Sequence, residues 1–417
     1  MYAICSGSLK ERVNLNLFTM AKKIRKKFHY LMRLPKWLKA HTVQLDLRKE
    51  RRFIFMTIFA LTLFGVLMIY ESSSIYVYQT TDDPAYFFKR QFMFLLIGLG
   101  LFFLTLFVDL EFLRRHNKEI LAVTFILLAL VLVLGKKAGG ARRWFQLGWI
   151  NLQPSELLKI SFLLYCADYF RRRSNLIRNF FRGVFPLWIV LGVICVLVAL
   201  QPDLGSAIFW IMWTFLMLFL YRAKRRYLVF IIILGIVFSF FLIKFYPYRF
   251  RRITAYLDPF ADPQGAGFQL IQSQIAYGEG GIFGVGFGEG KQKLFFLPAA
   301  HTDFIFSIIA EEFGLWGSFG ILSIFFVIFH KMFRIAQRAR EGFARGILWG
   351  IILVFFLEIA INIGVSCGLF PTKGLSLPFI SYGGSNLIVH YILLGLFFNA
   401  SRKIRTEGGI SASVTGM

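Results

Sequence analysis

Charged residues are scarce in this 417-residue chain, and acidic ones are the scarcest. Only 17% of residues are charged, with 22 Asp and Glu against 48 Lys and Arg, while 57% are hydrophobic. The mean hydropathy is +0.63. A soluble domain of this length has too little polar surface to cover so much apolar area, and several runs approach the ~20 apolar residues that cross a bilayer. The composition excludes a soluble protein and predicts a polytopic helical membrane protein.

Cysteine is also rare, and its placement excludes a fold held together by disulfides and a metal site built from cysteine. The cysteines are scattered, three of them inside apolar runs, with no metal-binding spacing and no disulfide framework. We therefore expect free thiols and no metal site built from cysteine. The four residues are Cys5, Cys166, Cys195 and Cys367.

The N-terminal segment 21–40 lacks the apolar core of a cleaved signal peptide and is instead strongly basic. Met20 directly precedes this segment and is a candidate start. The net charge of +26 does not indicate nucleic acid, because 14 of the 48 basic residues lie before residue 53 and most others form short clusters between apolar runs. Lys and Arg are placed in this way when they set topology and contact anionic headgroups. We expect membrane lipids as partners, and no nucleic acid.

Ten apolar segments predict an all-α polytopic membrane protein with about ten transmembrane helices. The basic connections predict that both termini are cytoplasmic. The chain then divides into a basic cytoplasmic tail (1–50), a transmembrane domain (51–403) and a C-terminal cytoplasmic tail (404–417). The segments are 53–71, 87–107, 120–134, 157–170, 184–199, 206–220, 228–246, 304–330, 346–368 and 387–400.

The outward-facing connections carry most of the unusual sequence. The longest, 247–303, joins the seventh and eighth helices and is rich in Gly and aromatic residues. A loop of this length is usually functional or partly folded. Its 269–290 stretch predicts a short amphipathic helix that leads into a glycine-rich turn region. The other outward connections are 72–86, 135–156, 200–205 and 369–386.

Several outward connections retain cations against the topological preference. Arg142 and Arg143 lie beside Gly139, Gly140 and Trp144. Cations kept on this side indicate an anionic ligand such as a phosphate or pyrophosphate, with Arg as bidentate donor and Lys as point charge. Contact with lipid headgroups is the alternative. The lysines of this group are Lys136, Lys137, Lys291, Lys293 and Lys373.

Polar residues at the outer ends of helices allow structural or functional interpretations. Glu156 and Lys159 lie three residues apart, share a helix face and are expected to pair. Asp203 in QPDLGS stands at the outer end of a helix that Pro202 can start, where an acid favours the helix dipole. Deeper in the membrane, a hydrogen-bonded pair of Glu358 and Asn362 is expected to be structural, as is His390.

The stretch PTKGLSLPFISYGGSN (371–386) interrupts an apolar region with two prolines, three glycines and three serines. Non-helical backbone at membrane depth is tolerated only where it is buried in protein or lines a wet cavity. We expect a re-entrant or cavity-lining loop that presents Lys373, Ser381 and Ser385.

Three carboxylates stand in LPAAHTDFIFSIIAEEFG (297–314). On a helix that runs from Asp303, Glu311 lies about 80° away and ~12 Å deeper, and Glu312 points to the opposite side. This geometry predicts Asp303 at an outward mouth, Glu311 lining the same groove and Glu312 packed against another helix. Intramembrane ionisable residues are functional candidates by default.

The chain resembles the SEDS family of bacterial shape, elongation, division and sporulation proteins. The similar motifs are GGARRWFQLGWINLQPSELLKI, QPDLGS, HTDFIFSIIAEEFG and PTKGLSLPFISYGGSN, in the family's order, and the resemblance covers roughly residues 51–403. PTKG and DPFADPQGAGFQLIQSQIAYGEGG look more like the division branch than the elongation branch. GGSN is a small departure, since many relatives have a second serine there.

The resemblance implies a peptidoglycan glycosyltransferase that polymerises lipid II on the outer face of the bacterial inner membrane, at the division septum. It also implies a class B penicillin-binding protein as cross-linking partner, and other divisome proteins. The family's essential aspartate matches Asp303, which we interpret as the general base for attack of a sugar 4-hydroxyl on C1 of the donor. Arg142, Arg143 and Lys373 are candidate ligands of the departing pyrophosphate. The remaining substrate-binding candidates are Trp144, Gln153, Glu156, Lys159, Gln201, Asp203, Gln272, His301, Thr302, Glu311, Ser381 and Ser385.

The sequence leaves other functions open. A lipid II flippase also needs a polar intramembrane route, to which Glu311, Glu358 and Lys159 can contribute, and an elongation-branch polymerase or a non-enzymatic divisome scaffold are further alternatives. The polar motifs concentrate on the outward side, which favours the polymerase. No cofactor is indicated; a divalent cation (Mg²⁺ or Mn²⁺) that accompanies the pyrophosphate would leave no motif.

Overall fold

A computed structural model describes residues 36–404 except 139–140, 149, 246–253, 266, 299, 340–341 and 373. Lys373, Gly139, Gly140, Cys5 and Met20 lie outside the described residues. Within this range, Phe53–Ile404 forms one compact unit, which contains the candidate site and the helices that support it.

Each of the ten apolar segments corresponds to one long helix, so the predicted helical polytopic fold is confirmed. Among the described residues, seven helices are long and apolar enough to cross a membrane, and Leu204–Leu220 is a shorter apolar helix. The number of spans stays a prediction. The helices are α2 (Lys36–Thr81), α3 (Tyr86–Thr105), α5 (Asn117–Leu134), α6 (Pro154–Arg173), α7 (Phe185–Leu200), α8 (Leu204–Leu220), α9 (Arg225–Phe245), α12 (Ile305–Gln337), α13 (Phe343–Ser366) and α14 (Gly384–Arg402).

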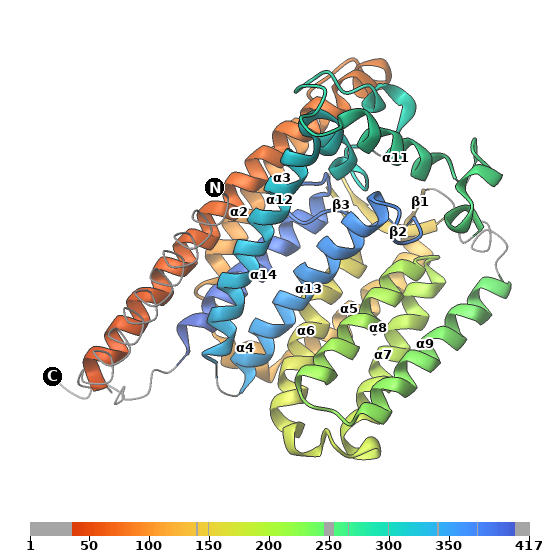
Figure 1. The fold of residues 1–417 in the computed structure, drawn as a ribbon. Helices are drawn as coiled ribbons and strands as arrows, with labels where there is room; N and C mark the ends of the chain where they lie inside the picture. The colour runs from red at the N-terminus through yellow and green to blue at the C-terminus, as the bar shows by residue number, and fades with distance from the viewer. Residues whose placement is uncertain are drawn as a thin grey trace, which may run out of the picture. The chain divides into compact units, whose positions relative to one another are not determined.

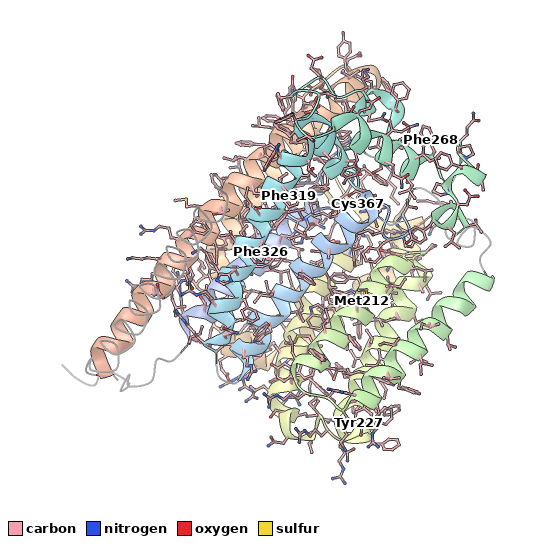
Figure 2. All side chains as sticks on the ribbon, viewed as in Figure 1. Met212, Tyr227, Phe268, Phe319, Phe326 and Cys367 are labelled. Atoms are coloured by element: carbon pink, nitrogen blue, oxygen red, sulfur yellow. The ribbon has the colours of Figure 1, made fainter. Side chains whose placement is uncertain are left out.

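Helices α13 and α14 form the centre of the bundle. In the apolar stretches of α13 and α14, 78% and 72% of the residues are buried, against 28% in the apolar stretch of α12. Small residues allow neighbouring helices to approach them closely: a Cβ on Gly98 of α3 would lie 3.0 Å from Tyr391 of α14, and one on Gly346 of α13 would lie 2.6 Å from Ala167 of α6. Helix α12 lies at the outside, as the exposed side chains of Phe319 and Phe326 show (Figure 2).

A small sheet in the 135–156 connection corrects the expectation of a purely α-helical chain. Strands β1 (Lys136–Ala138), β2 (Ala141–Leu147) and β3 (Ile150–Leu152) are antiparallel in the order β1-β2-β3. Gly148, with φ of 60°, directly follows β2. Only a glycine adopts this backbone conformation readily, and a short glycine-containing turn between residues of high strand propensity is a hairpin signal that hydropathy alone does not detect.

The long outward loop contains the expected amphipathic helix, α11 (Phe268–Gly280). Its Ser273 hydroxyl donates to the Ser366 carbonyl at 2.6 Å and lies 2.7 Å from the Ser307 hydroxyl, so α11 is joined to the end of α13 and the start of α12. Figure 1 shows α11 and the three strands near the same end of the bundle, the end at which α12 begins. The 135–156 and 247–303 connections therefore lie at the same end of the bundle.

The opposite end of the bundle gathers the basic connections. Asn399 of α14 donates to the carbonyls of Thr105 at 2.9 Å and Val108 at 2.7 Å. Buried Asp168 at the end of α6 accepts from Arg171 at 3.2 Å and Arg172 at 2.7 Å. A carboxylate that would be unfavourable alone is thus compensated by guanidinium groups. This is the end that the sequence assigns to the cytoplasm.

Candidate active site

Asp303 lies in a turn directly before α12. The predicted helix from Asp303 is wrong, because α12 begins at Ile305 and Phe304 has non-helical φ and ψ of −115° and 18°. The turn is fixed by Asn362 of α13, whose amide donates to the Asp303 carbonyl at 2.9 Å and to the Leu375 carbonyl at 2.6 Å. One buried side chain thereby joins the Asp303 turn to the 371–386 loop.

The Asp303 carboxylate faces the backbone of this loop. A Cβ added to Gly374 would lie 3.0 Å from Asp303 Oδ2, so the glycine allows the loop to come close to the acid. Lys373, the neighbouring candidate cation, is outside the described residues. The loop itself has no regular secondary structure between Pro371 and Gly383 in its described part, which confirms the irregular backbone expected there.

His301 packs by its ring. The ring stacks on Phe87 with centroids 4.5 Å apart and meets Tyr382 at 5.8 Å. The Tyr382 amide donates to the His301 carbonyl at 3.0 Å. Burial lowers the pKa of His301 to about 4, so the ring is neutral at physiological pH.

The lowered pKa predicts acid sensitivity of the folded protein. The unfolded chain binds a proton at His301 near pH 6.5, whereas the folded chain binds it only near pH 4. Between these values the unfolded state holds more protons, so this contribution to stability is present above pH 6.5 and is lost as the pH falls, by up to about 1.4 kcal/mol per pH unit. Thermal unfolding of the wild type and of His301→Phe, which keeps the stacking, should diverge in this window. Parallel pH profiles for the two proteins would contradict the assignment.

The two candidate arginines bind carbonyls at the outer ends of different helices. Arg142 Nη1 donates to the Val133 carbonyl of α5 at 2.6 Å. Arg143 Nε donates to the Gln201 carbonyl, which follows α7, at 2.9 Å, and its Nη2 donates to Pro202 O at 2.5 Å. A guanidinium has five N–H donors, so these contacts do not exhaust either side chain. The structure brings Arg143 together with the QPDLGS loop.

Gln201 and Asp203 have internal partners in the same region. The Gln201 side chain is buried and donates to the Leu128 carbonyl at 3.1 Å. Asp203 is the N-cap of α8 and accepts from the Ser206 amide at 3.1 Å and hydroxyl at 2.7 Å. This is the capping interpretation of an acid at a helix start.

Gln153 and Ser385 join the sheet to α14. The Ser385 hydroxyl donates to the Asn151 backbone carbonyl at 2.7 Å and accepts from the Gln153 backbone amide at 3.2 Å. The Ser381 hydroxyl instead accepts from the Leu377 amide of its own loop at 2.8 Å.

Gln91 of α3 supports this loop from the side. It donates to the Ser381 carbonyl at 3.2 Å and accepts from the Gly383 amide at 3.3 Å. The sequence indicated this supporting role of Gln91 only by a single glutamine within the apolar run 87–107. A single glutamine does not by itself reveal a partner.

Glu156, Lys159, Glu358 and His390 form a buried chain of ionisable groups across α6, α13 and α14. Lys159 Nζ lies 2.5 Å from Glu156 Oε2 and also contacts Glu358 Oε1. Glu358 Oε2 lies 2.6 Å from His390 Nε2. The predicted Glu156–Lys159 pair is confirmed. The predicted Glu358–Asn362 pair is wrong. Glu358 contacts Lys159 and His390, whereas Asn362 donates to two backbone carbonyls, and the spacing of residues along one helix does not specify such partners on other elements.

Glu311 and Glu312 also differ from the prediction. Both carboxylates face the 288–293 segment of the outward loop: a Cβ on Gly290 would lie 3.1 Å from Glu311 Oε2 and 3.0 Å from Glu312 Oε1. Glu311 accepts from the Lys291 amide at 2.6 Å, and Glu312 accepts from Lys293 Nζ at 2.8 Å. Adjacent residues are only 100° apart on a helix, and a loop that wraps around it reaches both.

Three further candidates lie on elements of this end of the bundle. Trp144 is half-buried on β2 opposite Lys136, Gln272 is half-buried on α11, and Thr302 is half-buried beside Asp303. In the described part of the chain, no group of three or more His, Cys, Asp or Glu side chains is placed to hold a metal ion. Cys166, Cys195 and Cys367 are free thiols, as expected.

The site therefore combines an acid at the outer end of a helical bundle with an irregular loop and a buried ion chain. Asn362 and Glu358 connect the two parts, since they are four residues apart on α13, roughly 6 Å along its axis. These features define a polytopic membrane protein with a polar site at its outward end.

The model of the cell cycle protein family that comprises FtsW, RodA and SpoVE matches residues 51–406, and the chain belongs to this family. It is 42% identical over 357 residues to "Probable peptidoglycan glycosyltransferase FtsW" of Trichlorobacter lovleyi, covering 84% of this chain and 93% of the relative. An Escherichia coli O6:H1 protein of the same description is 39% identical over 362 residues, covering 86% and 87%. The division branch expected from the motifs is thus supported.

Two solved structures share the fold. One is a chain of a peptidoglycan synthase complex that coordinates polymerization and crosslinking, with a TM-score of 0.69, 32% identity and coverage of 84% of this chain and 96% of that chain. The other is the rod shape determining protein RodA of Thermus thermophilus, with a TM-score of 0.60, 27% identity and coverage of 84% and 96%.

Proposed function

We propose that this protein is a peptidoglycan glycosyltransferase that polymerises lipid II into glycan strands, with Asp303 as general base. The observation that carries the proposal is the Asp303 turn, which Asn362 joins to the 371–386 loop at the outward end of the bundle. Relatives about 40% identical over most of the chain are described as peptidoglycan glycosyltransferases.

The reaction joins two lipid-linked sugars. The 4-hydroxyl of the acceptor attacks C1 of the donor with inversion, the C1–O bond to the lipid pyrophosphate breaks, and the hydroxyl proton passes to the Asp303 carboxylate. A positioned base of this kind contributes roughly 10²–10⁴-fold in rate. Gly374, which has no side chain, allows the 371–386 loop to pack beside Asp303 Oδ2.

The departing pyrophosphate needs positive charge, and Arg142, Arg143 and Lys373 are proposed to supply it. Arg143 is held at the outward end by the carbonyls of residues 201 and 202, which fixes its guanidinium in the region where the strands meet the QPDLGS loop. The remaining donors of Arg142 and Arg143 are suited to phosphate oxygens. A divalent cation accompanying the pyrophosphate is compatible with this arrangement.

The proposed partner is a class B penicillin-binding protein that cross-links the product at the division septum. Support comes from the synthase complex that shares the fold and from the FtsW relatives. A lipid II flippase is less consistent with the contacts, because Lys159 and Glu358 pair with each other and Glu311 binds loop amides. These groups would have to leave their partners to line a route.

Reconstitution tests the function directly. The purified protein, with and without its synthase partner, is given labelled lipid II in liposomes, and glycan strands are resolved by gel electrophoresis. Strands that form with the partner support the polymerase. Transfer of labelled lipid II between leaflets without strand formation would support a flippase instead. If neither strand formation nor transfer is detected, a non-enzymatic scaffold is the remaining function.

A further inference from the structure

Helix α12 is broken at Gly314. This residue has φ of 64° and ψ of −159°, and the break divides the helix into a nine-residue outer half, 305–313, and a longer inner part, 315–337. Glycine is the residue that adopts such a conformation without strain. A break at membrane depth exposes backbone groups that need partners.

The outward loop supplies those partners. Residues 281–286 lie along the break and form hydrogen bonds with the backbone on both sides of it. Gly284 packs against the backbone of α12 so closely that no side chain would fit at this position: a Cβ added to Gly284 would lie 2.1 Å from the Glu312 carbonyl oxygen. The bonds are Val285 N to Glu311 O at 3.0 Å, Gly286 N to Glu312 O at 3.1 Å, Leu315 N to Gly281 O at 3.0 Å and Trp316 N to Ile282 O at 3.3 Å.

The next part of the same loop binds the carboxylates of the outer half-helix. Glu311, which is fully buried, accepts from the amides of Lys291 at 2.6 Å and Gln292 at 3.1 Å. Lys293 Nζ binds Glu312 Oε1 at 2.8 Å and also pairs with Glu71 of α2. Lys293 thereby joins three elements: the loop, the outer half of α12 and α2.

From these contacts we propose that residues 281–293 form a clamp that positions Asp303, and that Lys293 of the clamp and Gly314 at the break in α12 are the main positioning residues. Asp303 lies two residues before the outer half-helix that the clamp binds, and the break at Gly314 separates this half from the rest of α12. The inference rests on the proposed role of Asp303 as base and adds the structure that sets its position.

The geometry makes small movements consequential. The outer half-helix is roughly 13 Å long at 1.5 Å per residue, so a tilt of about 5° moves its Asp303 end by about 1 Å. A misplacement of this size can lower the rate of a chemical step by about 10²-fold. The clamp contacts Glu311 and Glu312 near the break, at the far end of this lever.

Lys293→Met tests the charged part of the clamp. The variant leaves Glu71 and Glu312 without their shared cation, so the outer half-helix should shift. We expect kcat for lipid II polymerisation to fall by about 10–100-fold while KM stays within about threefold, because the substrate contacts remain. Lys293→Arg should recover part of kcat. The double variant Lys293→Met/Glu312→Gln should lose no more than the single one, as expected for residues that act as a unit.

Gly314→Ala tests the break without changing charge, and Gly320→Ala is its matched control. A Cβ at Gly314 would lie 2.3 Å from the Gly284 nitrogen, whereas a Cβ at Gly320 on the same helix meets nothing within 4 Å. We expect a fall in kcat with little change in KM for Gly314→Ala and wild-type kinetics for Gly320→Ala. If Lys293→Met fails to fold, Gly314→Ala decides the question.

Thermal unfolding of each variant separates positioning from general destabilisation. Lower kcat in folded protein at unchanged KM supports the clamp; wild-type kcat in folded Lys293→Met and Gly314→Ala, or a loss that appears only as raised KM, overturns it. The outcome is distinct from failure of the proposed function. If Asp303→Asn abolishes polymerisation while both clamp variants are normal, only the clamp is wrong. If Asp303→Asn remains active, the proposed base is wrong.

Discussion

Asp303→Asn is expected to reduce lipid II polymerisation by about 10²–10⁴-fold, the contribution of a positioned general base. The amide is nearly isosteric with the carboxylate, and it cannot accept the hydroxyl proton. The turn should keep its geometry, because Asn362 binds the Asp303 backbone carbonyl and not its side chain. Glycan strands formed per minute from labelled lipid II measure the effect, in the presence of the synthase partner.

Glu279→Gln is a suitable control for this variant, because Glu279 is an exposed acid on α11 in the same outward loop and lies outside residues 281–293. It should polymerise at the wild-type rate. Both variants should unfold at the wild-type temperature and retain the synthase partner on co-purification. Near-normal strand synthesis by Asp303→Asn would remove Asp303 from the mechanism.

Lys159→Met is expected to destabilise the protein by about 3–5 kcal/mol, the usual loss when one partner of a buried ion pair is removed. Lys159 is 4% exposed and contacts both Glu156 and Glu358. Methionine fills a similar volume but leaves two carboxylates without a cation. Thiol-reactive dye can follow unfolding, since Cys166 and Cys195 are buried free thiols.

The second variant of this series, Lys159→Met/Glu358→Gln, removes one of the unpaired charges and should recover part of the loss. Lys137→Met changes an exposed lysine on β1 and should stay within about 0.5 kcal/mol of the wild type. A Lys159→Met protein as stable as the wild type would mean that the chain of ionisable groups contributes little. Lys159 would then be better explained as a residue kept for substrate.

Hydropathy and charge are sufficient to predict the helical framework. The ten apolar segments form long helices because backbone groups in hydrocarbon must bond within the helix. The basic connections meet at one end of the bundle and the outward connections at the other, since the strongly hydrated charges of Lys and Arg stay outside the hydrocarbon. Local spacing also suffices for the Glu156–Lys159 pair, whose members are three residues apart on α6.

The hairpin of β2 and β3 and the start of α12 are beyond hydropathy, because they depend on turn conformations at Gly148 and Phe304. Both the hairpin and the helix start depend on a few neighbouring residues, so the residue preferences of turns can predict them in part.

What the sequence by itself determined is the helical membrane class, which follows from composition and hydropathy. The sidedness of the loops and the choice of Asp303 as the outward acid follow from charge placement and from a motif along the chain, and they stay predictions. Only the tertiary structure decided the partners of the buried charges. Glu358 binds Lys159 and His390, and Glu311 and Glu312 bind a loop about 20 residues earlier in the chain. A buried charge is stabilised by whichever opposite charge or amide the fold brings within about 3 Å, and that proximity is a property of the packed bundle that no spacing along one helix contains.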